Sequence, residues 1–111
     1  MSINITRLLD IACIAKIEQG NNMSVASVEI DGHIIMKIFL SSSIVKDIAT
    51  LFEVKVFVEK VITELGAPVE SIDSHFNKVG SISIIELSFN TRIDSLLFQH
   101  EVSEGLEEFF R

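Results

Sequence analysis

The sequence predicts an α+β domain in which helices pack on a four-stranded antiparallel sheet, with the elements in the order αββαββα. Two tight-turn signals, Asp31-Gly32 and Gly80-Ser81, each lie between two apolar runs and predict a pair of β-hairpins. Between the hairpins, residues 41–66 carry apolar residues at helical spacing. Helical patterns also precede the first hairpin and follow the second, so the expected architecture is a sandwich of two or three layers.

Length and composition indicate a single domain, residues 1–111, with a core of ordinary size. Apolar residues make up 48% of the chain, and Cys13 is its one cysteine, so no disulfide can form within it. No apolar stretch is long enough to span a bilayer, and Asp10 and Lys16 interrupt the apolar run near the start, unlike a signal peptide. We therefore expect a cytoplasmic protein.

The net charge of −7 limits the classes of partner. Sixteen acidic residues against nine basic ones argue against binding to nucleic acid or to an anionic membrane through charge. The same balance permits a basic protein partner, although solubility alone would explain it equally well.

Residues 4–19 predict the first helix, which Gly20 and the two asparagines after it end. The residues expected to form its apolar stripe are Ile5, Leu8, Ala12 and Ala15, widened by Leu9 and Ile11. Cys13 is expected to behave as a small buried hydrophobe, because nothing in the sequence identifies a base that would activate its thiol.

Residues 23–40 predict a hairpin whose register follows from its turn. A type I′ turn at Asp31-Gly32 places Ile30 opposite His33, and the pairing continues outward from there. The second strand is then apolar on both faces, with Ile34, Met36, Ile38 and Leu40 on one and Ile35 and Phe39 on the other. Such a strand is central in its sheet and covered on both sides, or it lies in an oligomer interface.

Residues 41–66 predict the central helix. The apolar residues on its predicted core face are Ile44, Ile48, Leu51, Val54, Val58, Ile62 and Leu65. Ser41, Ser42 and Ser43 offer N-cap hydroxyls, and Gly66 suits the position after the helix that needs a positive φ. These serines could also hold an anion at the helix N-terminus, but helix capping is the simpler explanation for them.

A competing signal lies inside this segment. Residues 52–58 alternate between apolar and charged types, which is typical of a strand. The continuous helix is preferred, because a strand here would leave flanking segments too short to bury anything.

Residues 67–90 predict the second hairpin, with its turn at Gly80-Ser81. The register places Phe76 opposite Ile85 on an apolar face and His75 opposite Glu86 on a polar face. An alternative is a helix over residues 69–79, begun by Pro68 and ended by the glycine. The hairpin is preferred, because the strand over residues 82–89 needs a partner.

Residues 91–110 predict the last helix. Thr91 and Asp94 resemble a capping box in which Asp replaces Glu, and Gly105 weakens the helix near its end. The residues that share one side of the predicted helix are Ile93, Leu96, Leu97 and His100. Phe109 and Phe110, so near a chain end, must either dock on the core or bind something.

The pattern from Ile34 to Phe89, with the turn LGAPVESI after the central helix, resembles the strand–helix–strand–strand part of ferredoxin-like domains. The resemblance covers about half of the chain and includes no diagnostic motif. It implies a fold and no particular function, since such folds host many unrelated activities.

The candidate chemistry in the sequence is limited. The predicted second hairpin brings Asp73, His75 and Glu86 together as a candidate polar cluster, in which a carboxylate could tune an imidazole base. A cross-strand His–Glu pair is also an ordinary surface contact. No nucleotide-binding loop, CxxC pair or nucleophile elbow is present, so we expect no catalytic residue, no metal and no cofactor.

These observations favour a small acidic intracellular protein-binding module of the inhibitor, immunity-protein or adaptor type, which acts through a surface without catalysis. Its expected partner-binding residues are Glu101, Glu104, Glu107, Glu108, Phe109 and Phe110. The alternative is a regulatory domain of ferredoxin-like build that senses a small molecule. A homodimer is expected in either case, because the predicted sheet has more apolar face than one layer of helices would cover.

Overall fold

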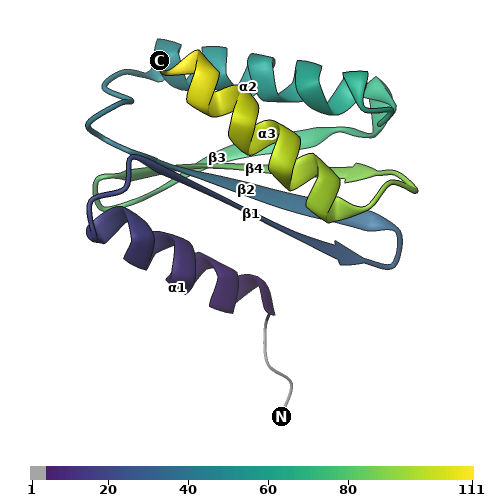
Figure 1. Ribbon diagram of the computed structural model, residues 1–111, viewed down its shortest axis with the longest axis horizontal. Coiled ribbons are helices and arrows are strands. Elements are labelled where there is room, and N and C mark those ends of the chain that lie inside the picture. The colour runs from purple at the N-terminus through teal and green to yellow at the C-terminus, as the bar shows by residue number, and fades with distance from the viewer. Residues whose placement is uncertain (1–4) are drawn as a thin grey trace.

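The computed structural model describes residues 5–111, and the side chains of residues 7–111. Within this range the chain forms three α-helices and one antiparallel sheet in the predicted order (Figure 1). The helices are α1 (Ile5–Glu18), α2 (Ile48–Glu64) and α3 (Ser95–Phe109). The strands are β1 (Met23–Ile30), β2 (His33–Ser41), β3 (Asp73–Val79) and β4 (Ile82–Asn90). The predicted helical start at residue 4 lies outside the described residues.

The fold has three layers, with α1 on one face of the sheet and α2 and α3 on the other (Figure 1). The strand order is β1-β2-β4-β3, so β2 lies inside the sheet. Its alternate residues enter two separate apolar clusters: Ile38 packs in the main core beneath α2 and α3, and Phe39 packs with Cys13 of α1. The prediction that this strand is central and covered on both faces is therefore confirmed, and Cys13 is buried as expected.

The first hairpin has the predicted register at every position from Ile30 opposite His33 to Met23 opposite Leu40. Asp31 has a φ of 50° and Gly32 a φ of 81°. Positive φ at both central residues is what a type I′ turn requires, and the twist of that turn matches the twist of the flanking strands.

The second hairpin is also confirmed, and the alternative of a helix over residues 69–79 is wrong. Only Val69–Ser71 form a single 3-10 turn, and β3 follows it with Phe76 opposite Ile85 and His75 opposite Glu86. Strands β2 and β3 each run antiparallel to β4, so they are parallel to one another and separated by it. This split β-α-β arrangement is that of ferredoxin-like domains, but here the remaining strand, β1, comes first in the chain.

Helix α2 is confirmed as a helix, but it begins later than the sequence predicts. Ser41 ends β2, and Asp47 caps the helix by accepting a hydrogen bond from the Thr50 amide at 2.7 Å. The prediction that Ser41–Ser43 cap this helix or hold an anion there is wrong, because six residues separate the end of β2 from the start of α2. At the other end Gly66, with φ +113°, ends the helix as predicted.

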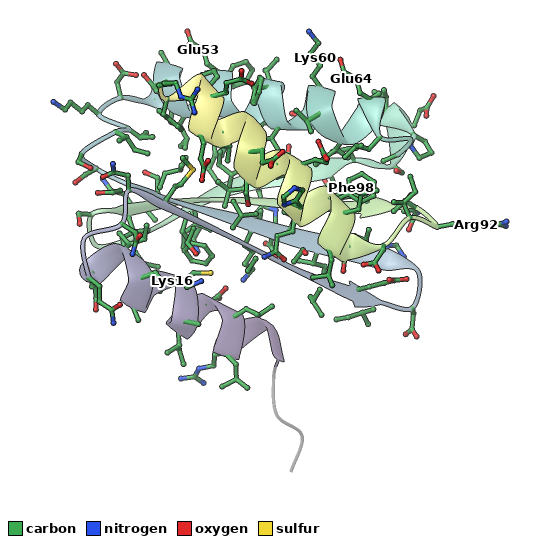
Figure 2. The ribbon with its side chains drawn as sticks, viewed as in Figure 1. Lys16, Glu53, Lys60, Glu64, Arg92 and Phe98 are labelled. Atoms are coloured by element: carbon green, nitrogen blue, oxygen red, sulfur yellow. The ribbon has the colours of Figure 1, made fainter. Side chains whose placement is uncertain are left out.

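The buried face of α2 is narrower than predicted. The residues of α2 that are buried against the sheet are Leu51, Val54, Val58 and Ile62. Ile48 instead lies on the exposed side of the first turn, while Ile44 precedes the helix. Figure 2 shows Glu53, Lys60 and Glu64 on the side of α2 that is turned away from the sheet.

The predicted stripe of α1 is wrong apart from Leu9, and the side chain of Ile5 lies outside the described residues. The side chains that pack beneath this helix are Leu9, Cys13, Ile14 and Ile17, whereas Leu8, Ile11 and Ala12 are exposed. Helix α1 is apolar on most of its circumference, so periodicity alone does not choose the buried side. The side chain of Asp10 bonds Lys37 of β2 at 2.9 Å, and this contact orients the helix.

The predicted side of α3 is also wrong. Its buried residues are Phe98, Val102 and Leu106, whereas Leu96, Leu97 and His100 are exposed. Asp94 itself is the N-cap and accepts from the Leu96 amide at 2.8 Å, so Thr91 and Asp94 form no capping box.

Gly105 has a role that helix propensity does not reveal. A Cβ atom at this position would lie 3.1 Å from a ring carbon of Phe57 in α2. The glycine thus lets α3 approach α2 closely where the two helices cross, and tertiary packing offsets its cost in helix propensity.

We expect Phe98→Ala to lower the free energy of unfolding by about 3–5 kcal/mol, because it leaves a large cavity beneath α3. Phe98 is fully buried and meets Phe89 edge to face, with 5.0 Å between the ring centroids; Figure 2 labels it beneath the helix. Denaturant unfolding measures the loss. Leu97→Ala, on the exposed side of the same helix, is the control and should cost less than about 1 kcal/mol. Equal losses would contradict the observed orientation of α3.

Asp47 gives the fold a pH-dependent contribution. The Thr50 backbone amide that it accepts from lowers the pKa of its carboxyl below the usual value. A lowered folded-state pKa adds stability above the pKa of the unfolded chain, and this stability is lost as the pH falls through the folded-state value. We expect Asp47→Ala to lower the melting temperature at neutral pH, and the difference to shrink under acid conditions; Asp47→Asn, which keeps a capping oxygen, should lose less. A pH-independent difference would rule out this role.

Candidate functional site

Charged side chains form a row across the face of the sheet that α1 covers. Lys37 of β2 lies directly opposite Glu86 of β4, and Glu86 lies opposite His75 of β3. The Lys37 Nζ atom is 2.9 Å from Asp10 Oδ2 on α1 and 3.9 Å from Glu86 Oε1. The second oxygen of Glu86 contacts the Nε2 atom of His75. The row therefore runs from α1 to the edge strand.

This row contains part of the predicted polar cluster. The structure brings His75 and Glu86 together as expected, but Asp73 lies opposite Ser88 and is exposed, and its side chain makes no hydrogen bond or ion pair to any described residue. The sequence reasoning missed Lys37 and Asp10. The lysine gave a signal, since it is the one charged residue within the apolar second strand, but its partners depend on the pairing of β2 with β4.

The burial of the row indicates a structural role. The side chain of Lys37 is 17% exposed and Glu86 is 26% exposed, whereas His75, at the open end, is 65% exposed. A half-buried ammonium needs a nearby carboxylate, and Asp10 and Glu86 supply two. The arrangement therefore holds charge in place between α1 and the sheet.

The second candidate site is the acidic face of α3, which comprises Glu101, Glu104, Glu107 and Glu108 with Leu96 and Leu97 at its start. Glu104, Glu107 and Glu108 are exposed, and Glu101 is half-buried. The helix contains no lysine or arginine. Among the described residues, only Glu104 of the four glutamates makes an ion pair, with His100 at 3.2 Å.

The predicted aromatic part of this site lies against the protein itself. Phe109 is half-buried and stacks at a tilt against Phe57 of α2, with 5.3 Å between the ring centroids. Phe110 meets Phe109 edge to face at 5.0 Å, and both side chains pack against the main core. The two phenylalanines therefore pack against the core of the protein, and the exposed apolar residues of α3 are Leu96 and Leu97 instead.

The glutamates of α3 are placed against the helix dipole. They occupy the helix from its middle to its end, where the unpaired carbonyls carry partial negative charge and favour cations. Local helix stability therefore does not explain them.

His100, Glu101 and Glu104 bring three potential metal-ligand atoms within 4.8 Å of one another. They project from a single exposed helix, and the residues that the structure describes add no fourth donor to the group. Most protein sites for transition metals draw ligands from more than one element and bury them, so this geometry does not define a metal site.

Two hollows lie near chain turns. One, of about 620 Å³, is lined by Gly32, Gly66, Pro68 and residues 90–93, where the first hairpin turn meets the two loops that flank the second hairpin. Arg92 extends from this region into solvent (Figure 2). The other, of about 250 Å³, lies between the start of α2 and the end of β3, and Ile48 and Lys78 are among its lining residues.

Comparison with known proteins adds no identification: no protein-family model, no curated protein and no solved structure matches the chain. Among the described residues, none of the helices has the length and apolar character needed to cross a membrane.

We expect Lys37→Met to lower the free energy of unfolding by about 1–2 kcal/mol, because it leaves Asp10 and Glu86 half-buried without their cation. His75→Ala at the exposed end of the row should cost only a few tenths of a kcal/mol. Urea unfolding of both variants measures the difference. A larger loss for the histidine would show that the row depends on its exposed end and would contradict a structural role centred on Lys37.

Proposed function

We propose that the protein is an acidic cytoplasmic protein-binding module that acts through the acidic face of α3 and without catalysis. The observation that carries the proposal is the run of glutamates along the second half of this helix, with one histidine as their only ion-pair partner among the described residues. Because the dipole disfavours these charges where they stand, a role in binding is the simplest reason for their presence.

The chemistry of this face suits a basic partner. Leu96 and Leu97 add two exposed apolar side chains at the start of α3, one to three turns before the glutamates. Apolar anchors beside charges of one sign are typical of interfaces in which charge steers the approach and apolar contact holds the complex. The expected partner therefore carries lysine or arginine beside an apolar side chain.

The test is capture of proteins from the source lysate on immobilised protein, at low and at high salt, with identification by mass spectrometry. The wild-type chain should retain a stoichiometric basic protein at low salt and release it at high salt. The triple variant Glu104→Gln, Glu107→Gln, Glu108→Gln should lose that protein while its melting temperature stays unchanged or rises slightly, since the dipole penalty is relieved.

The matched control removes the same number of charges elsewhere. Glu18, Glu53 and Glu64 are exposed on α1 and α2, outside the acidic face of α3. Changing these three to glutamine should leave capture intact. Equal loss in both triple variants would point to net charge alone and would overturn the assignment of α3.

A second candidate function is small-molecule sensing, which the hollow of about 620 Å³ favours, since its size is that of many ligand sites. Arg92 at its rim would favour a ligand with a carboxylate or phosphate group. A thermal-shift screen of small organic acids tests this function: a compound that raises the melting temperature of the wild type, but not of Arg92→Ala, would support it. A flat screen would leave the protein-binding proposal.

A further inference from the structure

The two outer edges of the sheet are treated differently. At the β1 edge, the side-chain amide nitrogen of Gln99 in α3 donates a hydrogen bond to the backbone carbonyl of Val25 at 3.1 Å. The Ser27 hydroxyl donates to the side-chain oxygen of Gln99 at 2.8 Å. Helix α3 thus satisfies a backbone group of β1 that points away from the sheet. The opposite edge is β3, where no described strand or helix provides the equivalent contact and every residue except Ser74 is exposed.

Alternate residues of β3 turn their backbone groups outward. In a two-residue hairpin, the residues that flank the turn exchange both of their hydrogen bonds, so Val79 and every second residue before it bond β4. The outward groups are then those of Ser74, Phe76 and Lys78. In agreement, the amide of Lys78 donates at 2.8 Å to the side chain of its neighbour Asn77. The edge has neither a proline nor a bulge, which are two of the devices that prevent strand addition, although it does carry Lys78.

An apolar stripe of α2 lies beside this edge. Ile48 is 74% exposed, Phe52 54% and Val56 50%, and they are spaced one turn apart. Ile48 and Lys78 line the same hollow, so the stripe begins next to the end of β3. Phe76, 36% exposed, lies on the face of the sheet that α2 covers, because it pairs with Ile85 of the main core.

We propose that this edge, with the α2 stripe, is the site at which a second copy of the chain binds, through antiparallel pairing of β3 with β3. The pairing places Phe76 of one copy opposite Phe76 of the other on the two-fold axis. Outward-facing residues then meet outward-facing residues, since Ser74 lies opposite Lys78 of the second copy. The result is a continuous eight-stranded sheet.

Charge favours a second copy as the occupant. The segment that enters β3 is acidic, with Glu70 and Asp73, whereas the far end is basic, with Lys78 and, lining the same hollow, Lys46. An antiparallel pair brings the acidic end of each copy to the basic end of the other, and the two-fold pairing sets no like charges opposite one another. In a chain with a net charge of −7, this edge can therefore meet a second copy without repulsion.

The geometry of such a dimer also places the start of the apolar stripe at the interface. A two-fold axis normal to the sheet keeps both copies of α2 on the same face, with Ile48 of each copy beside the joined edges. The α3 helices, which pack over β1, remain at the two far ends of the dimer. Dimerisation and binding at the acidic face of α3 therefore use separate surfaces.

The first test measures the dissociation constant of the dimer by sedimentation equilibrium. We expect a concentration-dependent dimer that is weakened at least about tenfold by Phe76→Lys, which sets two lysines opposite each other, and likewise by Phe52→Lys on exposed α2. Ile11→Lys, at a side chain 57% exposed on α1, makes the same charge change elsewhere and should leave the dimer intact. A wild-type chain that stays monomeric at high concentration, or a dimer that Ile11→Lys alone disrupts, overturns the proposal.

The second test reads the register. In the proposed pair, the two residues at position 76 face each other at a Cα separation that a disulfide can bridge, about 5.5 Å. Phe76→Cys should form a covalent dimer rapidly under oxygen with a copper catalyst. His75→Cys, one residue away on the other face and opposite Asn77 of the second copy, should cross-link much more slowly; native Cys13 is buried. Equal rates for the two variants would overturn the register and the two-fold axis at Phe76.

Discussion

The constraint on which this structure depends is a strand that is apolar on both faces. Ile38 and Phe39 are neighbours in β2, both are fully buried, and they belong to different cores. A strand of this kind cannot sit at an edge or leave one face to water without exposing several large side chains. The position of β2 inside the sheet, and the presence of helices on both sides of it, follow from that requirement.

The cover that the helices provide is uneven, and much of the surface chemistry follows from this. Helix α1 packs along β1 and β2. On the same face of the sheet, the charged row of Lys37, Glu86 and His75 occupies the part that extends toward β3. On the other face, α3 reaches the β1 edge through Gln99, while β3 has no equivalent partner among the described residues. The β1 edge of the sheet is thus partly covered by α3, whereas the β3 edge is uncovered among the described residues.

Two features of the helices run against local preference, and tertiary contacts explain only one of them. Gly105 costs helix propensity in α3, but the ring of Phe57 occupies the space that a side chain would need. The glutamates of α3 stand at the wrong end of the helix dipole, and within the described part of the chain their one compensating ion pair is with His100. An unfavourable arrangement without a packing reason is most simply understood as serving an interaction outside the chain.

The sequence by itself predicted the element order and both hairpin registers, although it left a helix over residues 69–79 open as an alternative, and it placed β2 either inside the sheet or in an oligomer interface. A two-residue turn such as Gly80-Ser81 fixes the pairing that it starts, so His75 and Glu86 could be placed together in advance. Only the tertiary structure decided which sides of α1 and α3 are buried. It also joined Lys37 to Glu86 and docked Phe109 on Phe57. The physical reason is that periodicity describes a helix without its neighbours. Helix α1 is apolar around most of its surface, so the sheet against which it packs selects its buried side.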